Sequence, residues 1–326
     1  MKLGIVIARA AALDTTWTTV HLAACALRQG HAVRFIEPWD FEVDGTGRMI
    51  ARAHSFDQPE PVEALVAQLV ERRAPRRYVD VRRLDLLLLR TSPLDASTLA
   101  FAARARDLGV SVVNDPDGIV KVRHKAWLAT CPGARVPPSV VTRSRASARM
   151  FLESQPSGVV VKPACGSGGK AVRRVRPRRL DDLEDAFDEA AAAGDGYVVV
   201  QRYIDEGQGG EKRLVWLDGQ VLGGYLRRRA AGEFRHNLKR GATAEPTQIT
   251  PEDHAAVETI SGPLLEAGIR LAGLDLLSGW IIEVNVRNPG GAYHTDRLAG
   301  TATADAILNR LSRTLEHDTP WVPPAR

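Results

Sequence analysis

Residues 269–290 read Ile-Arg-Leu-Ala-Gly-Leu-Asp-Leu-Leu-Ser-Gly-Trp-Ile-Ile-Glu-Val-Asn-Val-Arg-Asn-Pro-Gly, and their few polar positions guide the interpretation of the whole chain. Two apolar runs flank Ser278-Gly279, a pattern that predicts two strands joined by a tight turn. Glu283 and Asn285 point to one face of the second strand, and Asp275 shares it if the strands pair. Two carboxylates and an amide oxygen among apolar side chains suit Mg²⁺, which keeps waters and takes further ligands from nucleotide phosphates. The alternative is an ordinary hairpin with acidic side chains in solvent.

The length and composition of the chain are those of a globular protein with two or three lobes. It has 326 residues, of which 44% are hydrophobic and 25% are charged. No apolar run approaches the ~20 residues of a membrane-spanning helix. The opening run resembles a signal peptide, but Arg9 cuts it short, so a buried strand is the better interpretation. The three cysteines are scattered and lack metal-ligand spacing, which predicts a reduced, cytoplasmic compartment.

The net charge is +5, and the arginines cluster in two segments, at Arg173, Arg174, Arg176, Arg178 and Arg179 and at Arg227, Arg228 and Arg229. Nucleic-acid binding is one interpretation of such clusters. However, no aromatic residues are interleaved with the first cluster, as a platform for single strands would require. A solvated face, or a rim that attracts an anionic nucleotide or peptide, is favoured.

The first 120 residues predict a doubly wound parallel α/β lobe. Its expected strands cover 3–8, 31–36, 84–90 and 110–114; its helices cover 18–28, 61–73 and 95–108; and a hairpin covers 41–60. No glycine-rich dinucleotide fingerprint follows the first strand, so a standard NAD site is excluded.

The remaining chain predicts two α+β lobes, with domain boundaries at 1–120, 121–200 and 201–326. A short helix containing Lys121, His124 and Lys125 opens the second lobe. Strands are expected at 139–142, 158–163, around 172–175, 197–201, 213–217 and 221–228, and helices at 145–154, 180–193, 251–267 and 303–316. A glycine-rich turn is expected from Asn288 onward.

Glycines and a buried lysine mark a candidate phosphate site. Gly166-Ser-Gly-Gly169 lies between two strands and lacks the lysine–serine/threonine ending of a P-loop. Its backbone N–H groups could fold over a triphosphate, although a plain glycine hairpin is the alternative. Lys162 ends an apolar strand, and a buried lysine needs an anionic partner. Lys125 is a second candidate, or else an exposed helix lysine.

Further polar residues precede the acidic hairpin. Gln201-Arg-Tyr-Ile204 ends a strand where its backbone could bind an adenine edge, and Glu211 could accept from ribose hydroxyls. Arginine forks suit phosphate and carboxylate, and the alternative is a solvated basic loop; the candidates are Arg213, Arg227, Arg235 and Arg240, together with Asn237. No credible Ser–His–Asp or Cys–His set is present, which argues against a covalent protein nucleophile.

Taken in order, these motifs resemble the ATP-grasp superfamily, and their spacing is most similar to bacterial glutathione synthetase. The motifs are Lys125, Val-Val-Lys162-Pro, Gly166-Ser-Gly-Gly169, Gln201-Arg-Tyr-Ile204, Glu211-Lys-Arg213, Arg235-His-Asn237-Leu, Gly273-Leu-Asp275 and Glu283-Val-Asn285. The likeness extends to the amino-terminal Lys2-Leu-Gly-Ile-Val, to Ala51-Arg-Ala-His54 and to Leu89-Arg90. It implies an ATP-grasp fold preceded by a doubly wound parallel-sheet domain.

The resemblance also implies roles for the residues that match. Lys125 and Lys162 would hold ATP phosphates under Gly166, Ser167, Gly168 and Gly169; Gln201, Tyr203 and Ile204 would line the adenine pocket, with Glu211 on ribose; and Asp275, Glu283 and Asn285 would bind two Mg²⁺ ions. Arg213, Arg235 and Asn237 would stabilise the transferred phosphoryl group. A substrate carboxylate would attack the γ-phosphate of ATP, and an amine would then displace phosphate to give an amide. Positioning and charge neutralisation suffice for such chemistry.

Departures from the family pattern fall where the substrates should bind. The family carries a lysine where this chain has Thr91, and its serine/threonine-rich segment after the metal-binding asparagine is here 286–291. The loop 235–241 also resembles ribosomal-protein glutamate ligases. The predicted substrate residues are Arg90, Arg227, Arg240, Asn288, Gly290 and Gly291.

The expected substrates are a carboxylate and an amine, such as amino acids or a short peptide, and a homo-oligomer is an open expectation. The alternatives are an ATP-grasp kinase or carboxylase, and a non-enzymatic nucleotide- or nucleic-acid-binding module. A complete set of metal-ligand candidates, Asp275, Glu283 and Asn285, argues against a non-enzymatic binding module.

Overall fold

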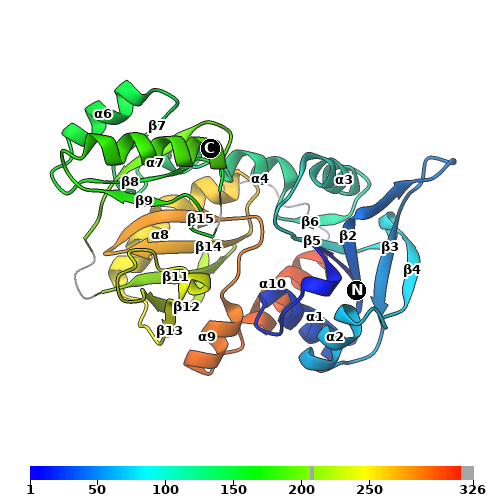
Figure 1. Cartoon of the computed structure of the whole chain (residues 1–326). Coiled ribbons are helices and arrows are strands. Elements are labelled where there is room, and N and C mark those ends of the chain that lie inside the picture. Colours follow the sequence, from blue (N-terminus) through cyan, green and yellow to red (C-terminus); the bar gives the residue numbers. More distant parts are fainter. Residues whose placement is uncertain (167, 206–208, 317–326) are drawn as a thin grey trace.

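The computed structural model describes residues 1–166, 168–205 and 209–316, which form three lobes, each built on its own β-sheet (Figure 1). Ser167, which the sequence predicts to contact phosphate, lies outside the described residues. Within the described ranges, no helix has the length and apolar character needed to cross a membrane.

The first sheet runs in the order β4-β3-β2-β1-β5-β6. Its strands are β1 (Lys2–Ile7), β2 (Ala32–Val43), β3 (Met49–Phe56), β4 (Arg76–Asp80), β5 (Leu86–Arg90) and β6 (Ser111–Val113). Its helices are α1 (Thr18–Arg28), α2 (Val62–Val70) and α3 (Ala96–Asp107). β1, β2, β5 and β6 are parallel and form the expected doubly wound core, whereas β3 and β4 add an antiparallel edge. Asp44 makes the hairpin turn by accepting backbone N–H bonds from Thr46 and Arg48.

Two local predictions in the first half of the chain need correction. The sequence predicts no strand at β4, because its charged and mostly exposed side chains give no apolar signal for an edge strand. The predicted short helix with Lys121, His124 and Lys125 is two helices, α4 (Pro116–Val122) and α5 (Ala126–Ala129). His124 and Lys125 lie in the bend between them.

The second sheet, in the order β7-β10-β8-β9, is covered on one face by two helices (Figure 1). Its elements are β7 (Ser139–Thr142), α6 (Arg145–Glu153), β8 (Val159–Pro163), β9 (Arg173–Val175), α7 (Leu180–Ala193) and β10 (Val198–Arg202). Alternation along β8 sends Val159 and Val161 into the core with the helices. Val160 and Lys162 therefore face the opposite side, toward the third lobe.

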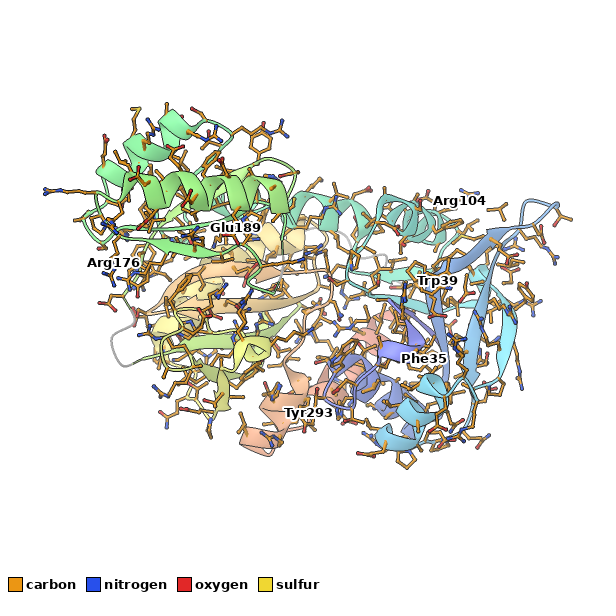
Figure 2. All side chains as sticks on the ribbon, viewed as in Figure 1. Phe35, Trp39, Arg104, Arg176, Glu189 and Tyr293 are labelled. Atoms are coloured by element: carbon orange, nitrogen blue, oxygen red, sulfur yellow. The ribbon has the colours of Figure 1, made fainter. Side chains whose placement is uncertain are left out.

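The arginine-rich segment 173–179 lies beside the acidic helix α7. Arg173 is 3.8 Å from Glu189, and Arg179 is 3.3 Å from Asp182. Arg176 and Glu189 both project from the surface of this lobe in Figure 2. The acidic residues neutralise part of the cluster, as a solvated face of mixed charge would require.

The third sheet is antiparallel throughout, in the order β13-β12-β11-β14-β15. Its elements are β11 (Glu211–Leu217), β12 (Gln220–Arg228), β13 (Thr243–Glu245), α8 (Pro251–Glu266), β14 (Leu271–Leu277) and β15 (Trp280–Asn285). α8 begins with a capping box between Thr250 and Asp253 and packs apolar side chains on one face of the sheet. The opposite face looks across to Lys162.

The end of the described chain returns to the first lobe. Helix α9 (Ala292–Ala299) follows the glycine-rich turn and was not predicted, because Tyr293, His294 and Thr295 interrupt any clear apolar stripe. Helix α10 (Thr303–Glu316) packs against α1 (Figure 1). Ile307, Leu308 and Leu311 are fully buried there with the core of the first sheet.

A buried asparagine also joins the first lobe to the acidic hairpin. The Asn114 side-chain amide donates to the carbonyls of Leu271 (2.7 Å) and Val286 (2.9 Å) and accepts from the backbone N–H groups of Arg270 and Leu271. All four bonding positions of this amide are used. The hairpin is therefore held in a fixed position relative to the first sheet.

Candidate functional site

A cleft of about 930 Å³, open to solvent, lies between the facing sides of the second and third sheets. Most residues that the sequence assigns to nucleotide and metal line it: Lys125, Lys162, Gly166, Gly169, Gln201, Tyr203, Ile204, Glu211, Arg235, Asn237, Asp275 and Glu283. Residues that are far apart in the sequence, from Lys125 to Glu283, thus meet at one place.

Lys162 is a buried cation at the floor of the cleft. Its Nζ donates to Gln201 Oε1 (3.0 Å) and to the carbonyl of Ile282 (3.1 Å). Gln201 is oriented in turn by donating to Ser139 Oγ (3.0 Å). Burial lowers the pKa of Lys162 to about 8, although nearby Glu283 partly opposes that effect. Two neutral acceptors leave the charge largely uncompensated, so an anion would be attracted here.

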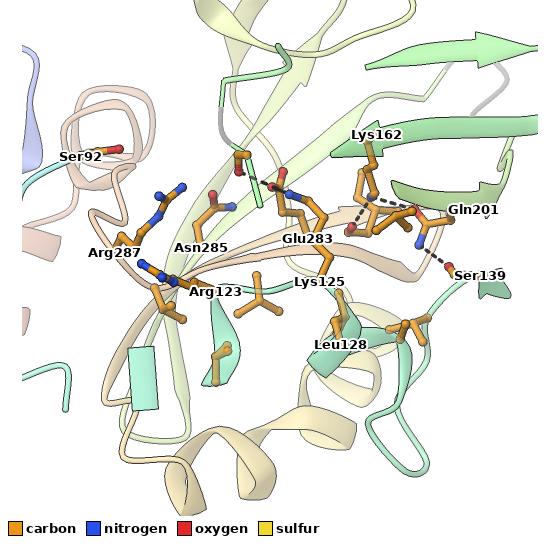
Figure 3. Close-up of a pocket in the computed structure, with 18 of the residues that line it drawn as sticks. Ser92, Arg123, Lys125, Leu128, Ser139, Lys162, Gln201, Glu283, Asn285 and Arg287 are labelled. Atoms are coloured by element: carbon orange, nitrogen blue, oxygen red, sulfur yellow. Dashed lines mark hydrogen bonds and ion pairs between the residues drawn. The ribbon is translucent and has the colours of Figure 1, made fainter. Parts of the chain in front are cut away.

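Lys125 lies between the glycine loop and the acidic hairpin. Its Nζ donates to the carbonyl of Gly166 (3.3 Å) and lies 3.5 Å from Glu283 Oε1. Both lysines therefore lie near the Glu283 carboxylate (Figure 3). The alternative of an exposed helix lysine is wrong, because the side chain is 14% exposed.

The far end of the cleft is apolar and suits a planar base. Tyr203, Ile204, Leu277 and Ile282 line it, and the Arg174 guanidinium lies 3.6 Å from the centre of the Tyr203 ring. At its edge Glu211 forms a buried ion pair with Arg227 and lies 3.7 Å from His236 Nδ1. The predicted ribose acceptor is thus present in the cleft and already shares its carboxylate with an arginine.

The acidic hairpin has the pairing that its sequence predicts. Asp275 pairs with Glu283 and Gly273 with Asn285 across β14 and β15. Asn285 Nδ2 lies 3.2 Å from Asp275 Oδ2, so the two side chains share a face. The alternative hairpin with solvated acids is wrong for Asp275, which is 2% exposed.

Two arginines hold the Asp275 carboxylate. Arg213 contacts both of its oxygens at 2.5 and 2.9 Å, and Arg227 lies 2.6 Å from Oδ1. Burial by itself would raise the pKa of Asp275, but these ion pairs outweigh burial and hold it at about 2. Asp275 is therefore an anion at neutral pH, as a metal ligand must be.

The donor chemistry of the three side chains fits Mg²⁺. Asp275, Glu283 and Asn285 offer hard oxygen atoms from adjacent strands, and a flip of the Asn285 amide turns its oxygen toward the carboxylates. A cation there would also relieve the repulsion between two carboxylates that oppose each other directly across the strands.

The described part of the glycine loop adopts left-handed backbone that favours glycine. Gly168 has φ +69° and Gly169 has φ +67°. A Cβ atom on Gly169 would collide with the Asn237 side chain, whereas one on Gly168 would meet nothing within 4 Å. Arg235 donates to the carbonyls of Gly169 (3.2 Å) and Val172 (3.5 Å). Arg235 and Asn237 therefore contact the loop as well as the cleft.

A second cavity, also open to solvent, continues from the two lysines toward the first lobe (Figure 3). Its rim carries Ser92, Arg123, Arg287 and Asn288. Burial, together with the charge of Arg123, lowers the pKa of Arg287. Among the described residues, no hydrogen bond or ion pair of the Arg287 side chain is found. Sequence reasoning did not select either arginine, although each lies two positions from a predicted site residue, Lys125 or Asn285.

The predicted substrate residues are distributed unevenly. Asn288 lines the second cavity. Arg90 is buried and donates to the carbonyl of Pro289 (2.8 Å), so it holds the segment before Gly290 and Gly291. Gly291 donates its N–H to Thr18 Oγ1. Arg227 contacts Asp275 and Glu211, whereas Arg240 is exposed and lines neither cavity.

Comparison with known protein families gives two matches that together cover nearly all of the chain. Residues 126–300 match the family described as prokaryotic glutathione synthetase, ATP-grasp domain, and residues 1–120 match its N-terminal domain. A glutathione synthetase from Nostoc is 26% identical over 97% of this chain and 99% of its own length. One from Rhodopseudomonas palustris is 29% identical over 89% and 91%.

Among solved structures, the D-cycloserine synthetase DcsG superposes with a TM-score of 0.65 at 18% identity, covering 95% of this chain and 99% of its own. At that identity the likeness concerns the fold. It extends over all three lobes, so the arrangement of sheets around the cleft is one that a solved protein also adopts.

Proposed function

The chain belongs to the prokaryotic glutathione synthetase family, and on that premise we propose how its cleft makes an amide bond and which groups select the substrates. It is an ATP-dependent ligase that forms a carbon–nitrogen bond. The observation that supports the proposal best is the meeting of two lysines, a glycine loop and an acidic hairpin around one cleft.

In the proposed first step, a substrate carboxylate attacks the γ-phosphate of ATP and forms an acyl phosphate. Lys125 and Lys162 hold the phosphates by charge, since both lysines line the cleft together with Glu283. Tyr203 and Ile204 hold the base, and Glu211 accepts from the ribose. Arg235 and Asn237, which line the cleft, and Arg213, which holds Asp275, stabilise the negative charge of the transferred group.

In the proposed second step, an amine attacks the acyl carbon and phosphate leaves, giving an amide. The glycine loop excludes water from the acyl phosphate, which would otherwise hydrolyse. Asp275, Glu283 and Asn285 would hold Mg²⁺, two ions in our proposal, which would neutralise phosphate charge. No protein nucleophile is needed.

We propose that Arg123 and Arg287 bind a carboxylate of the substrate. Two guanidinium groups of like charge lie close enough for Arg123 to lower the pKa of Arg287. An anion between them would relieve that repulsion and accept bidentate bonds. The Thr91 hydroxyl, by contrast, donates to the carbonyl of Pro93 and brings no cation to this region. We therefore assign binding of the substrate carboxylate to Arg287 and not to residue 91. Arg287 lies in the segment 286–291, which departs from the family pattern.

The substrates in this proposal are a small carboxylate and an amine, with γ-glutamylcysteine and glycine as the first pair to test and another amino acid or short peptide as the alternative. We place the enzyme in the cytoplasm, where ATP is made and thiols stay reduced; its three cysteines are free. Association into a homo-oligomer remains a proposal drawn from related enzymes.

The test of substrate recognition is Arg287→Met, which keeps the length of the side chain and removes its charge. The KM for the carboxylate should rise by roughly tenfold or more, the equivalent of losing one charge-assisted hydrogen bond. The KM for ATP should change little. Arg240→Met is the matched control, because Arg240 lines neither cavity. Equal carboxylate KM values in both variants would contradict the assignment.

A further inference from the structure

Three side chains with metal-binding atoms meet beside the start of the glycine loop, apart from the acidic hairpin. They are His124, in the bend between α4 and α5, Cys165, which precedes Gly166, and Asp195, in the turn between α7 and β10. Their ligand atoms all lie within 4.8 Å of one another. His124 Nε2 is 3.5 Å from Asp195 Oδ2, and the Cys165 sulfur lies within 4.8 Å of a ligand atom of each of the other two residues.

We propose that these residues, the His–Cys–Asp cluster, bind one divalent transition-metal cation, with Zn²⁺ as the expected occupant. A thiolate sulfur, an imidazole nitrogen and a carboxylate oxygen are the usual zinc ligands. A sulfur ligand disfavours Mg²⁺, which prefers oxygen, so this site would be distinct in selectivity from the acidic hairpin. Three protein ligands leave a fourth position for water.

The distances require only a small contraction. In a tetrahedral zinc site neighbouring ligand atoms lie roughly 3.5 Å apart, as follows from the usual bond lengths. The imidazole and carboxylate are already at that separation. The remaining ligand atoms would approach by about 1 Å, which side-chain rotation can supply because all three residues are at least partly exposed.

The backbone already joins the three segments. Lys125 donates its N–H to the carbonyl of Ala164 (3.1 Å), and Ala164 donates to the carbonyl of Tyr197 (3.0 Å). Asp195 Oδ1 accepts from the Tyr197 N–H (3.1 Å), which leaves Oδ2 facing His124. The ligands are thus preorganised by bonds that do not involve the metal-binding atoms.

A hydrogen bond of His124 limits the affinity of the His–Cys–Asp cluster for the cation. His124 Nδ1 accepts from the N–H of Ala126 at 3.2 Å, so Nε2 carries the proton in the metal-free state. Coordination through Nε2 moves that proton to Nδ1, and the bond from Ala126 is given up. The site should therefore bind more weakly than a closed four-ligand zinc site.

A cation bound to the His–Cys–Asp cluster would hold the start of the glycine loop in place. Cys165 is adjacent to the loop, and His124 is adjacent to Lys125, so one cation would fix both relative to the second sheet. Turnover would then be slowed, because Lys125 and Gly166 both line the cleft. This consequence rests on the proposed function, whereas the binding itself does not.

The binding experiment uses Co²⁺ as the probe, added to the full chain after treatment with a chelator and in the absence of ATP. A thiolate bound to Co²⁺ gives a near-ultraviolet charge-transfer band that oxygen ligands do not give. We expect one Co²⁺ per chain with this band, which Zn²⁺ then displaces. Cys165→Ser should abolish the band, and Asp195→Asn and His124→Gln should each weaken Co²⁺ binding by at least about tenfold.

Cys131→Ser is the matched control and should keep the band, because Cys131 is a half-buried free thiol outside the cluster. Absence of the band in the wild type, or its persistence in Cys165→Ser, would overturn the site. In a separate arm, Zn²⁺ should slow turnover of the wild type and the control several-fold more than that of Cys165→Ser. If Zn²⁺ slowed the wild type and Cys165→Ser equally, the proposed effect of the cation on turnover would be wrong, while the binding result would stand. A wild type without activity would instead contradict the proposed function.

Discussion

At the scale of single residues, the position of Lys162 supports its proposed role in holding the phosphates of ATP. Val159 and Val161, on the core side of strand β8, are fully buried. Because side chains alternate between the two faces of a strand, Lys162 points to the cleft. Burial lowers its pKa from an ordinary value of 10.5 to about 8. A phosphate beside it would favour the charged form.

This lysine gives ATP binding a predictable pH dependence. Between pH 8 and 10.5 the unfolded chain holds the proton more tightly than the folded protein, so the free energy of unfolding should rise with pH in that window. ATP affinity should move the other way and fall as pH rises through 8, because bound phosphate needs the proton that the free protein loses. Calorimetry of ATP binding at pH 8, in buffers of different ionisation enthalpy, should show proton uptake that Lys162→Met removes. Equal affinities at pH 7.5 and pH 9 would contradict this account.

Residue patterns predicted the face that Asp275, Glu283 and Asn285 share but not its surroundings. The spacing of Glu283 and Asn285 was sufficient, because alternation along a strand is a local property. The ion pairs of Asp275 with Arg213 and Arg227 depend on the register between β11, β12 and β14, which is a tertiary property. For the same reason, Arg123 and Arg287 were recognised only when two distant segments were seen at one rim.

At the scale of elements, the loop after β8 provides an internal comparison between two glycines. Gly168 and Gly169 share the same left-handed backbone, but only Gly169 faces Asn237. A side chain at either position should introduce similar backbone strain, on the order of 1 kcal/mol. Any larger effect at Gly169 must come from its contact.

We expect Gly169→Ala to lower turnover at least about tenfold beyond Gly168→Ala, a difference of about 1.4 kcal/mol in transition-state stabilisation. The added methyl group would displace Asn237 from its proposed position beside the transferred phosphoryl group. Steady-state kinetics of the two variants at saturating ATP would measure it. Equal losses in the two variants would show that backbone strain, and not the contact with Asn237, limits the loop.

Most elements followed from periodicity, and the exceptions have physical causes. Helices α1 and α7 were predicted with the bounds that they have, since each is bordered by glycine or carries a clear apolar stripe. Strand β4 and helix α9 were missed because their own sequences carry no clear apolar pattern. Pairing with a neighbouring strand stabilises β4, and packing stabilises α9. The bend at His124 and Lys125 was missed because its sequence is compatible with a helix.

At the scale of the whole molecule, helix α10 packs against helix α1 of the first lobe. Its buried side chains join a core with β1, α1 and α2, and strands β11 and β14 of the third sheet contribute to the same core. The first and third lobes therefore share apolar packing. The second lobe has a separate core.

Ile307→Ala should consequently destabilise the first lobe while leaving the nucleotide cleft intact. Ile307 is fully buried, so the expected loss in the free energy of unfolding is about 2–5 kcal/mol. The exposed Arg313→Ala serves as the control and should change it by less than about 0.5 kcal/mol. Urea unfolding, with ATP affinity measured in native buffer, separates the two effects. A stability equal to that of the control would contradict the shared core.

The measurement that tests the central claim most directly is phosphate release from ATP with Mg²⁺, in the presence of paired carboxylates and amines, with products weighed by mass spectrometry. The first pair is γ-glutamylcysteine with glycine, followed by other amino acids and short peptides. The account predicts phosphate release that needs both substrates, and a product one water lighter than their sum. It also predicts that Glu283→Ala loses both signals while remaining folded. Phosphate release without an amide, or full activity in Glu283→Ala, would contradict it.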